Sequence, residues 1–405
     1  MQIRTINLHP MILKQPGSNS LWTRNFTLLT LSLVLISTAF YLLMPTLPVY
    51  LQEVLQANKK EVGIIMAMYT LAALLVRPFT GFVLDTYGRK TLFLISIVLF
   101  SILFFLYPVS AAILPLMILR FLHGLNWGAA TTSGFTLVVD FVPYEKRGRG
   151  IGYFGLSFTI AMSIGPVLGI KLMQTGSFTM VFLIAGVISF LGAGASLLLS
   201  YPRFDRPERR TFSFKKLIAK QSLPVSANMM ILAATNGGII TFVTLYAKEI
   251  GLNHLTGWFF FVMAGGTALT RVFSGKLFDK YGPTLISVFG ILAVSGGMML
   301  LSQIPIPFGF LAAGFTVGIG FGVIFPTLQT MANNVVHRDR RGAANSTFLT
   351  GLDLGIGIGA VLTGIFAGRM GLSWTYEMSS LFALGGLLFF LLFSLPHYSR
   401  NRIAE

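Results

Sequence analysis

The sequence contains no cysteine among its 405 residues, and only 11% of its residues are charged. The absence of cysteine excludes disulfides, thiol catalysis and cysteine-ligated metals. The scarcity of charge excludes an ordinary soluble domain, because 54% of the residues are hydrophobic and the mean hydropathy is +0.76. A soluble chain of this size could not bury that much apolar surface. Apolar runs of about 18–25 residues recur and are long enough to cross a bilayer, so the sequence predicts a polytopic helical membrane protein.

Acidic residues are scarce as well, with 13 Asp and Glu against 30 Lys and Arg. A net charge of +17 can indicate a nucleic-acid partner, but here the basic residues stand in short segments between apolar runs. That placement follows the positive-inside rule. It predicts the lipid bilayer as partner, no nucleic acid, and both termini on the cytoplasmic side of a prokaryotic plasma membrane.

Hydropathy predicts twelve transmembrane helices in an all-α fold. The predicted spans are 25–51, 61–84, 91–108, 112–140, 148–171, 178–201, 222–247, 256–278, 284–303, 307–335, 342–367 and 374–396.

Two charged segments interrupt this pattern at the start and near the middle of the chain. Residues 1–24 lack a compact apolar core and a small-residue cleavage site, so we expect a cytoplasmic tail rather than a signal peptide. Residues 202–221 form the longest charged stretch, which we interpret as a cytoplasmic linker. The expected units are therefore 1–24, 25–201, 202–221, 222–397 and a tail at 398–405.

The sequence also lacks the motifs of several enzyme classes. No phosphate-binding loop followed by Lys-Ser/Thr is present, and the five histidines are scattered and form no helical metal pair. The "GIGFG" stretch at 318–322 lies in a predicted span, without the strand that a dinucleotide fingerprint needs. We therefore expect no enzyme activity, no metal site and no cofactor.

An internal repeat relates the two halves of the chain at a constant offset of 194 residues. It superimposes "VRPFTGFVLDTYG" on "TRVFSGKLFDKYG", so that Arg77 matches Arg271 and Asp85 matches Asp279. Gly124 and Gly318 match as well. The repeat predicts two six-helix bundles related by pseudo-two-fold symmetry. Secondary transporters have this architecture, with a site at the bundle interface near the midplane.

Three motifs carry a resemblance to a known family. "GFVLDTYGRK" (81–90), "RFLHGLNWG" (120–128) and "GPVLG" (165–169) resemble the second-loop, fourth-span and fifth-span motifs of the major facilitator superfamily. The resemblance covers essentially the whole chain. Within the superfamily, the chain is similar to the twelve-span proton-driven drug and metabolite exporters. It implies alternating access and a protein that functions as a monomer.

The first motif predicts a latch at the cytoplasmic face. By resemblance, Asp85 meets the N-terminus of the eleventh span, where unpaired N–H groups attract a carboxylate, and Arg89 pairs with Asp140. Closing the latch favours the outward-facing state. The alternative is simple topological charge. The latch residues are Gly81, Asp85, Gly88, Arg89, Lys90 and Asp140.

The fifth-span motif favours efflux over uptake, because the resembled exporters share it. Its glycines permit close packing and its proline permits bending. The full motif has another glycine where Ile170 stands. The residues of this predicted antiporter-type helix are Gly155, Gly165, Pro166 and Gly169.

Asp353 falls near the middle of the eleventh span, between apolar residues and glycines. An ionised carboxylate there costs about 2.5–3.5 kcal/mol on insertion scales, so such residues usually have a function. We predict that Asp353 carries the coupling proton. The alternative is a structural carboxyl group bonded to Ser, Thr, backbone groups or a buried Arg.

Three arginines also fall inside predicted spans, and each needs a counter-charge or a wet cavity. Arg120 is predicted to couple proton and substrate together with His123 three residues later, although a structural imidazole explains His123 equally well. Arg77 and Arg271 hold equivalent positions and are expected to share a structural role. The predicted cavity residues are Asn126, Trp127, Asn228, Met229 and Asn236.

The combined prediction is a proton-coupled antiporter that exports a small amphipathic drug or metabolite. Uptake by proton symport, export of a sugar or lipid, and a non-transporting membrane receptor remain alternatives. The predicted partners are a small-molecule substrate and protons.

Overall fold

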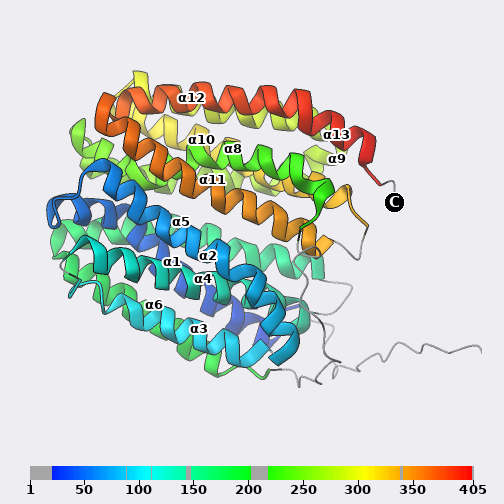
Figure 1. The fold of residues 1–405 in the computed structure, drawn as a ribbon, viewed down its shortest axis with the longest axis horizontal. Coiled ribbons are helices and arrows are strands. Elements are labelled where there is room, and N and C mark those ends of the chain that lie inside the picture. The colour runs from blue at the N-terminus through cyan, green and yellow to red at the C-terminus, as the bar shows by residue number, and fades with distance from the viewer. Residues whose placement is uncertain are drawn as a thin grey trace, which may run out of the picture.

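The computed structural model describes residues 21–87, 89–110, 112–142, 147–201, 218–337 and 341–403. In that part of the chain the regular structure is helical, and the helices run roughly parallel to one long direction of the molecule (Figure 1). The first six helices are α1 (Arg24–Glu53), α2 (Lys59–Tyr87), α3 (Arg89–Phe104), α4 (Ile113–Phe141), α5 (Arg147–Thr175) and α6 (Phe178–Leu197).

The second half begins with a short 3-10 turn at Lys220–Ser222. Its helices are α8 (Leu223–Glu249), α9 (Thr256–Gln303), α10 (Pro307–Asn334), α11 (Arg341–Met370) and α12 (Leu372–Phe389). A π-turn, Phe390–Ser394, continues α12 into the short α13 (Leu395–Asn401).

α9 contains two of the predicted spans, joined at a sharp break. Gly282 has φ +71°, a backbone conformation that favours glycine, and Pro283 begins the second segment. The two segments therefore cross the bundle separately, as the sequence predicts. With α9 counted twice, the fold has twelve transmembrane helices in two six-helix bundles.

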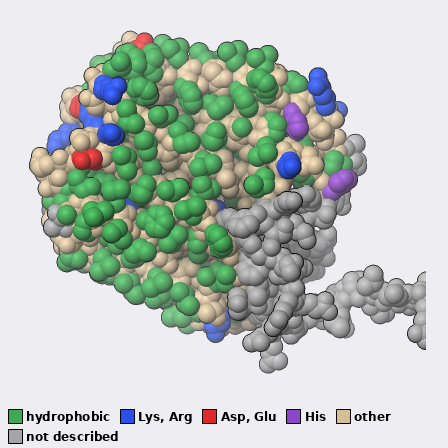
Figure 2. All heavy atoms as spheres, viewed as in Figure 1, with side chains coloured by type: hydrophobic (Ala, Val, Ile, Leu, Met, Phe, Trp, Pro, Cys, Tyr) green, Lys and Arg blue, Asp and Glu red, His purple; other side chains and the backbone are tan. Residues whose placement is uncertain are grey.

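The outer surface of the bundles is apolar. Nine helices in the described residues are long and apolar enough to cross a membrane. Many large hydrophobic side chains are exposed, among them Leu191, Val272 and Leu392. Figure 2 shows such side chains over the broad middle of the visible face, with Lys, Arg, Asp and Glu gathered toward its ends. This distribution suits a protein surrounded by lipid.

The packing of glycines confirms the internal repeat. A Cβ atom on Gly124 would lie 2.1 Å from the carbonyl oxygen of Tyr69, so α4 and α2 touch through their backbones. A Cβ atom on Gly318 would lie 2.1 Å from the carbonyl oxygen of Met263, the equivalent pair in the second half. Small residues allow this close approach between membrane helices.

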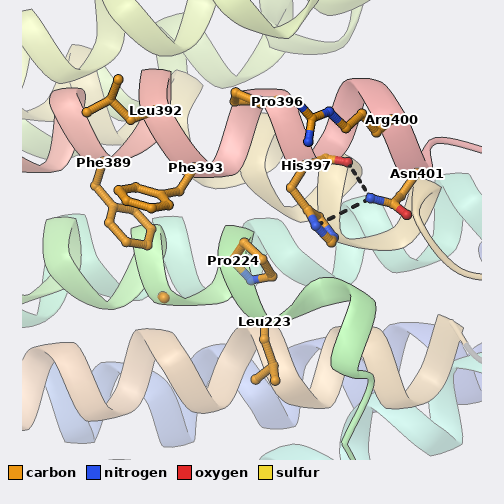
Figure 3. A pocket seen from close by; sticks show the side chains of 10 residues that line it. Leu223, Pro224, Phe389, Leu392, Phe393, Pro396, His397, Arg400 and Asn401 are labelled. Carbon is orange, nitrogen blue, oxygen red and sulfur yellow. Dashed lines mark hydrogen bonds between the residues drawn. The ribbon is translucent and has the colours of Figure 1, made fainter.

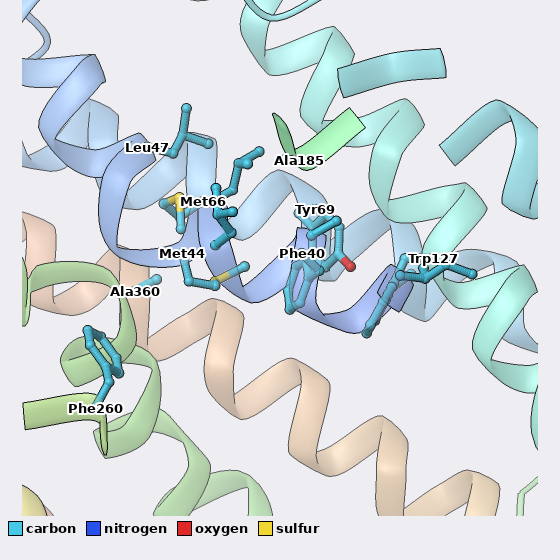
Figure 4. Packing of buried hydrophobic residues seen from close by; sticks show 14 of the residues in the cluster. Phe40, Met44, Leu47, Met66, Tyr69, Trp127, Ala185, Phe260 and Ala360 are labelled. Atoms are coloured by element: carbon cyan, nitrogen blue, oxygen red, sulfur yellow. The ribbon is translucent and has the colours of Figure 1, made fainter. Parts of the chain in front are cut away.

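A cluster rich in aromatic residues and methionine fills the side of the first bundle that packs against the second bundle (Figure 4). Phe40 of α1 stacks on Trp127 of α4 with ring centroids 4.5 Å apart, and on Tyr69 of α2 at 4.8 Å. Met44 and Met66 are buried beside them. Aromatic stacking of this kind fixes the relative positions of α1, α2 and α4.

Candidate functional site

The two bundles are joined inside the membrane by an ion pair. Arg77 on α2 places Nη2 2.9 Å from Oδ2 of Asp353 on α11. Both side chains are mostly buried, with 16% and 15% exposed. Each charge therefore offsets the desolvation of the other. Asp353 is thus bonded to a buried arginine, and its role in carrying the coupling proton stays a prediction.

The equivalent contact on the other side of the pseudo-two-fold axis lacks a carboxylate. Arg271 of α9 donates from Nη1 to the hydroxyl of Thr159 on α5, at 3.2 Å. Thr159 stands 194 residues before Asp353, as Arg77 stands 194 before Arg271. The guanidinium of Arg271 also lies 5.5 Å from the ring centroid of Phe325. One interbundle clasp is thus an ion pair, and its twin is a charge–hydroxyl contact.

Arg120 lies away from this pair, in the interior of the first bundle. Its side chain is 1% exposed, and its guanidinium lies 4.5 Å from the ring centroid of Tyr69. Nη2 reaches the sulfur of Met66 at 3.9 Å, while Nε and Nη1 have no hydrogen-bond partner in the described residues. The aromatic face of Tyr69 provides the electrostatic compensation.

His123 lies one helical turn after Arg120 and is also 1% exposed. Its Nδ1 shares a 2.9 Å hydrogen bond with the hydroxyl of Tyr107. The rings of Phe100 and Phe104 pack against the imidazole, with centroids at 4.2 and 4.5 Å. This surrounding is that of a packed structural imidazole, and the role of His123 in coupling stays a prediction.

Four charged residues meet at one end of the bundle interface, which we call the outer end after the orientation predicted from the sequence. Lys59 at the start of α2 pairs with Glu249 at the end of α8, at 2.6 Å. Lys248 of α8 pairs with Glu53 at the end of α1. Both pairs join the first bundle to the second, and each bundle contributes one lysine and one glutamate. We call these four residues the outer charge clasp.

Backbone contacts close the same end. A Cβ atom on Gly63 of α2 would lie 2.4 Å from the carbonyl oxygen of Ala360 on α11, and one on Gly364 would lie 2.4 Å from that of Lys59. Farther in, a Cβ atom on Gly357 would lie 3.5 Å from Cβ of Thr70. α2 and α11 are therefore in contact from the outer charge clasp inward.

The predicted cytoplasmic latch is described only in part. Arg89 forms an ion pair with Asp140, and Lys90 is exposed with its ammonium 5.6 Å from the ring centroid of Tyr201. Gly88 lies outside the described residues, as do the surroundings of Gly81 and the side chain of Asp85. The Arg89–Asp140 pair lies within the first bundle, and the latch itself stays a prediction.

The predicted antiporter-type residues lie on α5. Cβ atoms on Gly165 and Gly169 would collide with α1, at 2.8 Å from Cβ of Tyr41 and 2.4 Å from the carbonyl oxygen of Leu42. Pro166 is buried within the same helix, whereas Gly155 has nothing within 4 Å. Across the bundle interface, α5 meets α9 through Thr159–Arg271 and through Val167, which is 3.5 Å from the position of a Cβ on Gly257.

Most of the predicted cavity residues are packed inside the protein. Trp127 and Met229 are 7% and 1% exposed and lie in the apolar cores of the first and second halves. Asn228 is fully buried and donates to the carbonyl oxygen of Gly386 at 2.8 Å. Asn126 donates to Leu122 within its own helix, and Asn236 is partly buried. A role in substrate contact stays a prediction for all five.

The family model described as Major Facilitator Superfamily matches residues 29–351 and 305–405. The chain belongs to the Major Facilitator Superfamily. Members of this superfamily transport small molecules and are not enzymes.

Among relatives, an uncharacterized MFS-type transporter of Methanocaldococcus jannaschii is 25% identical over 84% of this chain and 90% of its own length. The quinolone resistance protein NorA of Staphylococcus aureus (strain MRSA252) is 26% identical over 82% of this chain and 87% of its own length.

Among solved structures, a bacterial homolog of the human lysosomal transporter Spinster, inward-facing and unoccupied, superimposes with a TM-score of 0.79. It is 14% identical, and the match covers 96% of this chain and all of that one. The nucleoside transporter NupG gives 0.73 at 14% identity, covering 91% and 99%. At these identities the likeness shows the fold.

Sequence reasoning missed two features of this site. It counted Lys59 and Lys248 only as charges between spans, because a pairing between distant helix ends leaves no local pattern. It also missed Thr159, although the repeat offset could have found it: the residue 194 positions before Asp353 is the one that faces Arg271.

Proposed function

We propose that the protein is a proton-coupled secondary active transporter that exports a small amphipathic drug or metabolite by alternating access. The observation that carries this proposal is the Arg77–Asp353 ion pair between the two bundles. This pair places a carboxyl group that can accept a proton, that of Asp353, at the interface between the bundles, which must open and close during transport.

The proposed cycle uses this pair as a switch. When Asp353 is ionised it holds Arg77 and stabilises the contact of α2 with α11. Binding of substrate from the cytoplasmic side must break this pair for the interface to separate, and the separated carboxylate, without its counter-ion, accepts a proton more readily. In the outward-facing state Asp353 takes up a proton from outside. In the inward-facing state it releases the proton to the cytoplasm and re-forms the pair, which leaves the carrier ready to bind substrate.

The arrangement of the bundles supports assigning the observed state to the inward-facing side of this cycle. The outer charge clasp and the backbone contacts at Gly63 and Gly364 all lie at the end predicted to face outward. Opening that end requires breaking two ion pairs and the Arg77–Asp353 pair together.

Two observations support export as the direction. The relative from Staphylococcus aureus is a quinolone resistance protein, and the chain carries the glycine–proline pattern on α5 that resembles exporters. We further propose a prokaryotic plasma membrane as the location, with both termini in the cytoplasm.

Proteoliposomes with an imposed pH gradient test the proposal, with a fluorescent quinolone as the probe. We expect gradient-driven flux in the wild type, a loss of at least tenfold in Asp353→Asn, and normal flux in the control Glu377→Gln, whose half-buried side chain on α12 accepts a hydrogen bond from Gln303 away from the Arg77–Asp353 pair. Gradient-driven flux that survives in Asp353→Asn would overturn the coupling role. Flux in the same direction as the protons would favour uptake by symport, the second candidate.

A further inference from the structure

A groove of about 580 Å³ opens on the surface between the start of α8 and the end of α12 with α13 (Figure 3). Its walls at one end are apolar. Phe389 and Phe393 stack there with ring centroids 5.1 Å apart, next to Leu392. Leu392 and Phe393 are 67% and 58% exposed, so this end of the groove faces the lipid rather than the protein core.

The groove is a formed feature of the backbone. The π-turn Phe390–Ser394 adds a residue to one helical turn of the α12–α13 rod. At the same level, the hydroxyl of Ser394 donates to the carbonyl oxygen of Pro224 on α8, at 3.0 Å. The two helices are therefore held together behind the groove while the π-turn sets its wall.

The opposite end of the groove is polar. His397 shares a 2.8 Å hydrogen bond through Nε2 with the carbonyl oxygen of Gln221, which must accept. Asn401 donates to the carbonyl oxygen of His397 at 2.8 Å and contacts its Nδ1 at 3.3 Å. Nε2 of His397 is therefore the donor in the bond to Gln221. Arg400 lies beside these groups, exposed, with no carboxylate partner in the described residues.

The length and direction of the groove match one leaflet of a bilayer. The helical rise places Phe389 and Asn401 about 18 Å apart along the axis, while half of a hydrocarbon core is about 15 Å. The polar end lies at the C-terminal end of the chain, where the basic residues predict the cytoplasmic surface.

We propose that this groove binds one anionic phospholipid of the cytoplasmic leaflet. The headgroup phosphate lies against the guanidinium of Arg400, and one acyl chain lies along Phe389, Leu392 and Phe393. The charge complementarity selects the ligand: Arg400 has no carboxylate partner among the described residues, and a cation at the mouth of an apolar groove favours an anionic over a zwitterionic headgroup. The site is separate from the interbundle contacts and so is independent of the transport direction.

The chain offers a matched control for the test. Arg402 is exposed two residues beyond Arg400 and does not line the groove. Native mass spectrometry of the purified full-length protein, delipidated and titrated with phosphatidylglycerol or phosphatidylcholine, would count retained lipids. We expect one retained phosphatidylglycerol, about fivefold weaker retention in Arg400→Gln, and wild-type retention in Arg402→Gln. Ala227→Phe, which fills the apolar end, should weaken retention as well.

Three outcomes would overturn the assignment. Equal retention in Arg400→Gln and Arg402→Gln would mean a lipid held by general surface charge. Equal retention of phosphatidylcholine and phosphatidylglycerol would contradict a specific contact between Arg400 and an anionic headgroup. A dimer that dissociates in Ala227→Phe would show that a second copy of the chain occupies the groove. Thermal unfolding of each variant without lipid separates loss of binding from loss of the fold.

Discussion

Arg77 and Asp353 form a 2.9 Å ion pair between the bundles, and their pseudo-symmetric counterparts Arg271 and Thr159 form a 3.2 Å charge–hydroxyl bond. The repeat thus preserves the arginine and its partner position on both sides of the axis, while only one side carries a group that can accept a proton. Of these two equivalent contacts, one therefore contains a titratable carboxyl group and the other does not.

The energetic coupling of Arg77 with Asp353 is measurable by a double-mutant cycle. Arg77→Gln leaves the carboxylate without its counter-ion, and Asp353→Asn leaves the guanidinium without its own. The free energies of unfolding lost in the two single changes should therefore add up to more than the loss in the double change. We expect a coupling of about 1–3 kcal/mol. Thermal unfolding in detergent measures it, and strict additivity of the two changes would contradict a direct pair.

Thr159→Asp tests the asymmetry by supplying the missing carboxylate. The new side chain should pair with Arg271 and add a second interbundle ion pair, which raises the cost of separating α5 from α9. We expect substrate exchange in proteoliposomes to slow about tenfold, which corresponds to about 1.4 kcal/mol. Thr159→Asn introduces a side chain of nearly the same shape as aspartate but without the charge. This variant should exchange substrate at a rate close to that of the wild type. If both variants slow equally, the cause is steric and not electrostatic.

The outer charge clasp should bias the resting state of the transporter. Lys248→Glu places like charges opposite each other at Glu53, and the outer end should open more often. An impermeant maleimide added from outside should then label a cysteine at position 70 about 1.4- to fivefold faster, since exposed pairs contribute about 0.2–1 kcal/mol. The chain has no native cysteine, so a single reporter suffices.

The charge swap Glu53→Lys with Lys248→Glu restores opposite signs and is the control for that experiment. It should return labelling to the wild-type rate. Raising the salt concentration should weaken the effect of the single change, because these side chains are 40–58% exposed and are screened. Labelling that stays fast in the swapped protein would mean that Lys248 acts through packing.

Gly169 and Gly155 form a matched pair on one helix. A Cβ atom on Gly169 would lie 2.4 Å from a backbone oxygen of α1, whereas a Cβ on Gly155 meets nothing within 4 Å. Gly169→Ala should therefore lower the free energy of unfolding by about 1–3 kcal/mol. Gly155→Ala should leave it unchanged or raise it by up to about 1 kcal/mol, because alanine favours the helix. Equal effects on thermal unfolding would contradict the packing of α5 on α1.

Sequence reasoning reached the fold because membrane helices are specified locally. An apolar run of sufficient length must be helical in lipid, whatever its neighbours are, and the turn at Gly282-Pro283 divides α9 where the sequence predicts two spans. The repeat offset likewise predicts that Gly124 and Gly318 are equivalent, and their backbone contacts are alike.

The site could be predicted only in part. An aspartate stranded in an apolar run is visible in the sequence, but its partner is not, since three intramembrane arginines were available to Asp353. The rotation of the helices and the approach of α2 to α11 bring Arg77 to Asp353. Arg120 instead packs against the ring of Tyr69.

The amino-acid sequence alone determined that this chain lies in a membrane, folds as two repeated bundles and carries one carboxyl group in the middle of a span. These properties follow from the free energy of placing each residue in lipid. Only the tertiary structure decided which charges meet, because Lys59 with Glu249, Lys248 with Glu53 and Arg77 with Asp353 are pairs that exist by virtue of distances between helices far apart in the chain.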